Sequence, residues 1–132
     1  MNDATGKKEK WFFRIWEEGR HFDLWHANHF LVGIILGGTT IVYAQPFWVG
    51  FPISCVLILG WEYYEIFRGV KETLWNQVFD VVLGISGYLL FYHAYSYSDT
   101  ELYFSIFSSA IVLWLFLEVW GFGAYLKRRY RW

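Results

Sequence analysis

The chain has 132 residues, of which 56% are hydrophobic and 24% are aromatic. This apolar share exceeds the roughly 45–50% of a soluble domain. The formal net charge of −1 provides no electrostatic attraction toward nucleic acid. The single cysteine, Cys55, excludes an intramolecular disulfide and a cysteine-based metal cluster. We therefore expect a membrane protein with no nucleic-acid partner.

Residues 1–24 precede the first long apolar run and combine aromatic with charged side chains. They lack the apolar core and small-residue cleavage site of a signal peptide. Within this stretch Trp11 and Ile15 share one helical face, and Arg14 lies elsewhere. This pattern predicts a cytoplasmic tail followed by a short interfacial amphipathic helix on the lipid headgroups. A docking surface for another subunit is the alternative interpretation.

Four apolar runs fill residues 25–126, and at about 1.5 Å per helical residue each is long enough to cross most of a bilayer. The predicted helices cover residues 25–43, 47–67, 74–95 and 102–126. The sequence Ala-Gln-Pro at 44–46 separates the first two, and residues 127–132 form a basic cytoplasmic tail. The predicted fold is all-α, a polytopic membrane protein with four transmembrane helices in a bundle.

The positions of lysine and arginine predict the orientation. All eleven lie in the N-terminal segment, in the link between the second and third helices, or after the fourth helix. The two remaining links contain neither residue. We therefore expect a multi-pass protein of the cell (inner) membrane with both termini in the cytoplasm.

Each predicted helix carries polar side chains in its cytoplasmic third, where they would meet in one layer. They are His26 and His29, Glu62 and Glu65, Asn76 and Asp80, and Glu118. Ionisable side chains are costly in a bilayer and usually face the protein interior. Carboxylates with imidazole bind zinc, manganese or iron. We therefore predict a divalent metal ion held by His29, Glu62, Glu65 and Asp80, with the other three as supporting or alternate ligands. A hydrogen-bonded polar core and a proton or substrate pathway are the alternatives.

Small residues favour the same inward orientation. Gly33 and Gly37 share a face with His29 and form a small-residue motif for close helix contact. Asp80 and Gly87 likewise share a face of the third helix. A bundle that buries these glycines would therefore also turn the polar side chains inward.

The stretch from Trp61 to Gly87 resembles the YjdF-like and VanZ-like families of small bacterial membrane proteins. The residues that carry the resemblance are Trp61, Glu62, Glu65, Glu72, Thr73, Asn76, Asp80, Gly84 and Gly87. Asn76 stands where the YjdF-like pattern favours aspartate. The resemblance implies a four-helix fold with a polar site on the cytoplasmic side, and VanZ-like proteins are associated with glycopeptide resistance.

Three functions fit these patterns. The first is a membrane protein whose inner-leaflet site binds a divalent cation or a polar lipid headgroup, with or without catalysis. The second is an accessory or structural subunit of a larger membrane complex, because the chain is small and rich in aromatic residues. The third is a small proton-coupled transporter acting as a dimer. Membrane lipids are the common partner, with other subunits or a second copy as further ones.

Overall fold

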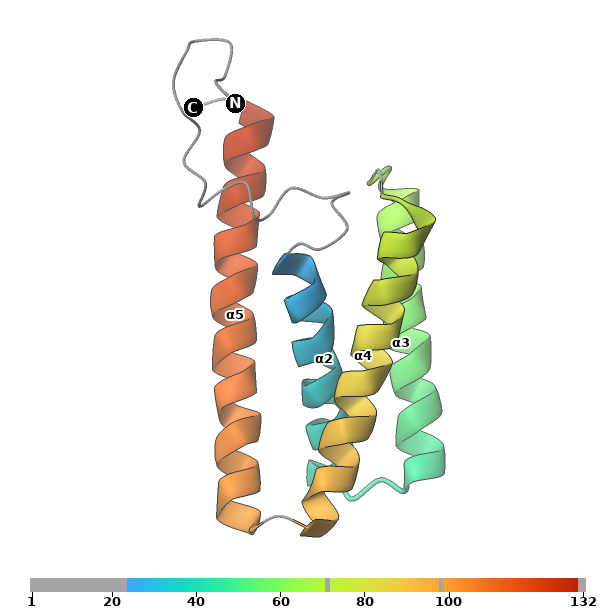
Figure 1. Ribbon diagram of the computed structural model, residues 1–132, viewed down its shortest axis with the longest axis vertical. Helices are drawn as coiled ribbons and strands as arrows, with labels where there is room; N and C mark the ends of the chain where they lie inside the picture. The colour runs from blue at the N-terminus through green and yellow to red at the C-terminus, as the bar shows by residue number, and fades with distance from the viewer. Residues whose placement is uncertain (1–23, 71, 98, 131–132) are drawn as a thin grey trace.

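The computed structural model describes residues 24–70, 72–97 and 99–130 (Figure 1). The elements in these ranges are α2 (Leu24–Val42), α3 (Phe47–Phe67), α4 (Leu74–Ala94), the short 3₁₀ helix η1 (Tyr95–Tyr97) and α5 (Thr100–Tyr130). No strand occurs among the described residues, so the all-α prediction is confirmed. The predicted interfacial helix falls on residues 1–24 and, apart from Leu24, lies outside the described residues.

The helix boundaries follow local signals in the sequence. Ala44 has a positive φ of 50° after α2, and Pro46 directly precedes α3. Gly69, with φ of 76°, follows α3 in the left-handed conformation that glycine adopts most easily. Thr73 caps α4, its side chain accepting a 3.3 Å hydrogen bond from the backbone N–H of Asn76. The predicted span 47–67 coincides with α3, whereas α5 continues beyond the predicted boundary at 126.

Among the described residues, three helical segments are long and apolar enough to cross a membrane: Phe47–Phe67, Leu74–Tyr97 and Thr100–Lys127. Large apolar side chains such as Trp48, Val56 and Val119 are exposed on their outer faces. Surfaces of this kind suit lipid contact. α2 is not one of the three, because its sequence contains polar residues and glycines that it turns toward the other helices.

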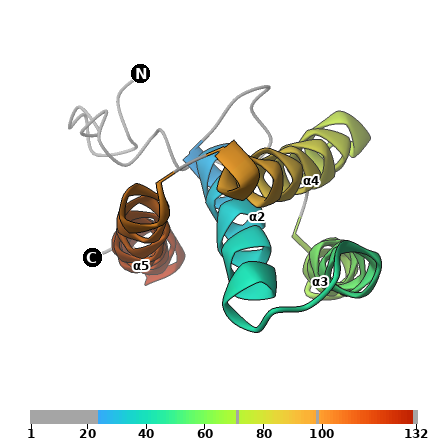
Figure 2. The same cartoon turned by 90° about the horizontal axis from the view of Figure 1, so that it is seen from below.

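α2 is the central helix and packs against α3, α4 and α5. Viewed along the long axis, it lies between α3 and α5, with α4 beside it (Figure 2). The closest crossing is with α4, where Gly33 and Gly37 face the backbone of Gly84 and Tyr88. Gly87 of α4 in turn faces the backbone of Phe30. The predicted small-residue motif therefore does form a close helix contact.

α5 packs on its neighbours through a regular stripe that the sequence analysis did not identify. Its buried side chains Tyr103, Ala110, Leu117 and Ala124 recur every seven residues. A seven-residue repeat is the spacing of a helix that packs along one seam. Ala110, Leu117 and Ala124 join Leu31 of α2 in one apolar cluster, whereas Tyr103 stacks on Phe91 of α4.

Candidate functional site

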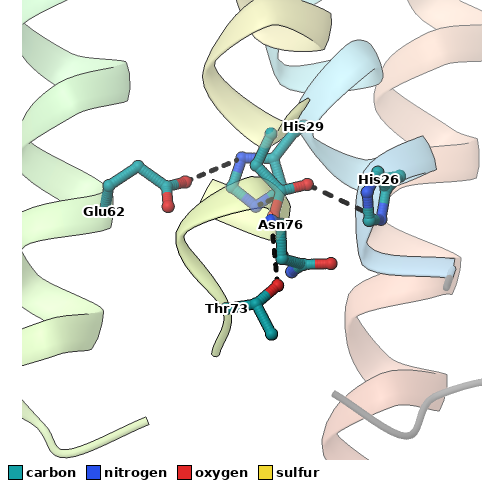
Figure 3. Close-up of polar contacts among 6 residues, drawn as sticks. His26, His29, Glu62, Thr73 and Asn76 are labelled. Carbon is teal, nitrogen blue, oxygen red and sulfur yellow. Dashed lines mark hydrogen bonds and ion pairs between the residues drawn. The ribbon is translucent and has the colours of Figure 1, made fainter. Parts of the chain in front are cut away.

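The predicted polar layer lies at the end of the molecule where α2 and α4 begin and α3 ends (Figure 1). His29 of α2, Glu62 of α3 and Asp80 of α4 each offer one ligand atom there, and these atoms all lie within 4.8 Å of one another. The close-up in Figure 3 shows Glu62 and His29 pointing toward each other from different helices. Three of the four predicted ligands thus come together from three helices.

The imidazole of His29 lies between the two carboxylates. Its Nδ1 atom is 3.4 Å from Oε1 of Glu62, and its Nε2 atom is 3.8 Å from Oδ1 of Asp80. His26 adds a second imidazole, with Nδ1 3.8 Å from the same Asp80 oxygen. These separations exceed the roughly 2.7–3.2 Å of an ordinary hydrogen bond. The four groups therefore lie next to one another without direct hydrogen bonds between them.

Asp80 is oriented by its own helix. The residue is 1% exposed, and its Oδ2 atom accepts a 3.2 Å hydrogen bond from the side-chain amide of Asn76, one turn earlier. Asn76 lies in the first turn of α4, and its backbone N–H donates to the Thr73 cap (Figure 3). This arrangement commits one carboxylate oxygen to Asn76 and directs the other toward both histidines. Asn76 thus positions a candidate ligand.

Glu62 is the carboxylate with the greatest need for a partner. The residue is 6% exposed, and neither of its oxygens has a hydrogen-bond partner among the described residues. Burying a carboxylate is costly unless it is paired or bound to a metal. The neighbouring His29 nitrogen at 3.4 Å satisfies that need only in part.

Glu65, the fourth predicted ligand, does not join this group. Its carboxylate instead lies with those of Glu62 and Glu72, with one oxygen from each within 4.8 Å of the others. Glu65 and Glu72 are both partly exposed near the link between α3 and α4. Glu65 lies one turn from Glu62, as helical spacing predicts, but its carboxylate groups with Glu72 at the link rather than with His29 and Asp80.

Glu118, predicted as a supporting or alternate ligand, contacts a residue that the sequence analysis did not name. Its Oε1 atom accepts a 3.1 Å hydrogen bond from the side-chain amide of Asn28. Asn28 is 3% exposed and was missed by the sequence analysis. Its signal was an amide inside an apolar run, at the depth predicted for Glu118. The two form a second polar contact, between α2 and α5.

Comparisons with known proteins add no family to this description. No protein-family model, curated protein or solved structure matches the chain. The resemblance to the YjdF-like and VanZ-like families therefore stays a prediction based on the residues quoted above.

Proposed function

We propose that this protein is a four-span membrane protein whose site at His29, Glu62 and Asp80 binds a divalent cation. One observation carries the proposal: three helices each supply a ligand atom, and the three atoms lie within 4.8 Å of one another. Glu62 and Asp80 are both buried. α2 is included as a span because its polar residues point into the helix bundle rather than toward lipid.

The charge at the site favours a cation. Two ionised carboxylates beside a neutral imidazole carry two negative charges, and a divalent ion would neutralise both. Two oxygen donors and one nitrogen donor suit zinc, manganese or iron(II) better than magnesium or calcium. A metal-bound histidine commonly donates its other ring N–H to a carboxylate. His29, with a carboxylate beside each ring nitrogen, is placed for that arrangement.

We also propose that the site lies in the inner leaflet, with both termini in the cytoplasm. The support is the distribution of lysine and arginine. Arg68 follows α3 and Lys127 lies near the end of α5, so both belong to the end of the molecule that holds the site. This orientation would make the ion accessible from the cytoplasm.

Titration of the detergent-purified, chelator-treated protein with Mn²⁺ and Zn²⁺ tests the proposal. We expect about one ion per chain for the wild type. Glu62→Gln and Asp80→Asn should each bind at least about tenfold more weakly, because even supporting residues of metal sites contribute about 10–100-fold. Glu101→Gln is the matched control. Glu101 is exposed at the start of α5, at the end of the molecule away from the site. Equal binding by all four proteins, or none by the wild type, would refute a cation site here.

A proton pathway is the second candidate, and one observation favours it. His26, Asp80, His29 and Glu62 form a continuous series of titratable groups, with successive separations of 3.8, 3.8 and 3.4 Å. Alternating imidazoles and carboxylates are typical of proton relays in membranes. Proton flux into proteoliposomes made with chelator-treated protein separates the two candidates. A proton flux that is present with the wild type and absent with His26→Gln would favour the relay over the cation site.

A further inference from the structure

A groove opens on the face of α2 that lies between α3 and α5. Its volume is about 300 Å³, at the small end of ligand pockets. Val32 and Leu36 of α2 and Leu57 and Ile58 of α3 form apolar walls. The stretch of α2 from Asn28 to Leu36 spans about 12 Å along the helix axis. The groove therefore provides an apolar channel roughly parallel to the helices.

One end of this groove is polar. Asn28 lines it, is 3% exposed, and has a side-chain oxygen with no hydrogen-bond partner among the described residues. An unsatisfied buried acceptor costs about 1–3 kcal/mol, so the site favours a ligand with a hydrogen-bond donor. Glu118 lines the same end and presents a carboxylate there. The head of a ligand would thus meet two acceptors, one of them acidic.

We propose that the groove binds a single-chain amphiphile whose head is an ammonium or hydroxyl group. The hydrocarbon chain would lie between Leu36 and Ile58, toward the middle of the predicted bilayer. The head would lie at Asn28 and Glu118, near the predicted inner surface, which is the orientation of an inner-leaflet lipid. A carboxylate or phosphate head is disfavoured, because Glu118 would repel it.

The groove borders the candidate cation site without depending on it. His29 lines the groove, and its ring nitrogens also approach Glu62 and Asp80. A bound head group would therefore lie next to the proposed ion. Amphiphile binding and ion binding can still be separated, because the apolar walls belong only to the groove.

Photo-crosslinking in nanodiscs with diazirine-bearing decylamine, decanol and decanoate tests this proposal. We expect saturable labelling of peptides that line the groove by the amine and the alcohol, and at least tenfold weaker labelling by the carboxylate. Glu118→Gln should reduce labelling by the amine relative to the alcohol, because the amine loses its acidic partner. Labelling spread evenly over the exposed faces of α3, α4 and α5, or equal labelling by decanoate, would overturn the proposal.

A blocked variant provides the second arm. Leu36→Trp should fill the groove and reduce its labelling at least tenfold, while Leu115→Trp, on the exposed face of α5, should leave it unchanged. The far-ultraviolet circular dichroism and unfolding transition of Leu36→Trp should match the wild type, which would show that the blocked protein is folded. Undiminished groove labelling in the Leu36→Trp protein would contradict the assigned position.

Discussion

The crossing of α2 and α4 should be the most sensitive contact in the fold to a single added methyl group. A Cβ atom at Gly37 would lie 2.9 Å from the backbone oxygen of Tyr88, whereas ordinary contacts begin at 3.4 Å. At Gly33 the added atom would meet the backbone oxygen of Gly84 at closer range still. Because two helix backbones face each other there, no flexible side chain can move aside, and Gly33→Ala should force the helices apart.

The expected cost can be estimated. Overpacking a tight contact costs about 1–3 kcal/mol, and alanine recovers up to about 1 kcal/mol through its higher helix propensity. Because the clash at Gly33 is with backbone atoms, the upper half of the overpacking cost, about 2–3 kcal/mol, applies, and Gly33→Ala should lower the free energy of unfolding by about 1–2 kcal/mol. Gly60→Ala is the matched control, because Gly60 also lies within a helix but has no atom within 4 Å of the added Cβ. That variant should be neutral or slightly more stable.

Reversible unfolding in mixed micelles, followed by far-ultraviolet circular dichroism, measures both variants. The crossing lies one helical turn from the candidate site, since Gly33 follows His29 by four residues and Gly84 follows Asp80 by four. Separating the helices should therefore also weaken ion binding in Gly33→Ala. If Gly33→Ala were as stable as Gly60→Ala, the close crossing of α2 and α4 would be incorrect.

Three further substitutions test other contacts by the same unfolding measurement. Tyr88→Phe removes a buried 3.3 Å hydrogen bond to Thr40 and should cost about 0.5–1.5 kcal/mol. Thr73→Ala removes the cap of α4, which should cost about 1 kcal/mol, and should weaken ion binding because Asn76 loses its anchor. Ala124→Leu places a larger side chain in the buried seam of α5 and should cost about 1–3 kcal/mol.

Exposed positions provide the controls for this series. Tyr97→Phe and Val119→Leu alter side chains that are exposed in the structure, so each should stay within about 0.5 kcal/mol of the wild type. A Tyr88→Phe protein as stable as Tyr97→Phe would show that the Thr40 hydrogen bond contributes nothing. An Ala124→Leu protein as stable as Val119→Leu would show that the α5 seam is loose.

Much of the site could be predicted because helical phase is a local property. Residues one turn apart share a face, so His29 with Gly33 and Asp80 with Gly84 were expected on the same sides of their helices. The same reasoning could not place Glu65 or Glu118. Phase gives the direction of a side chain but does not say which helix lies in that direction.

The sequence by itself determined the helical fold, the boundaries of α3, and the level along the helices at which the acids and imidazoles of the site occur. These properties depend on runs of apolar residues and on local breaks such as Pro46 and Gly69. The tertiary structure alone decided that α2 is central and that α5 packs along it. Consequently Glu118 of α5 accepts a hydrogen bond from Asn28 of α2. The physical reason is that packing partners are selected by the fit of whole helix surfaces, which no single stretch of sequence contains.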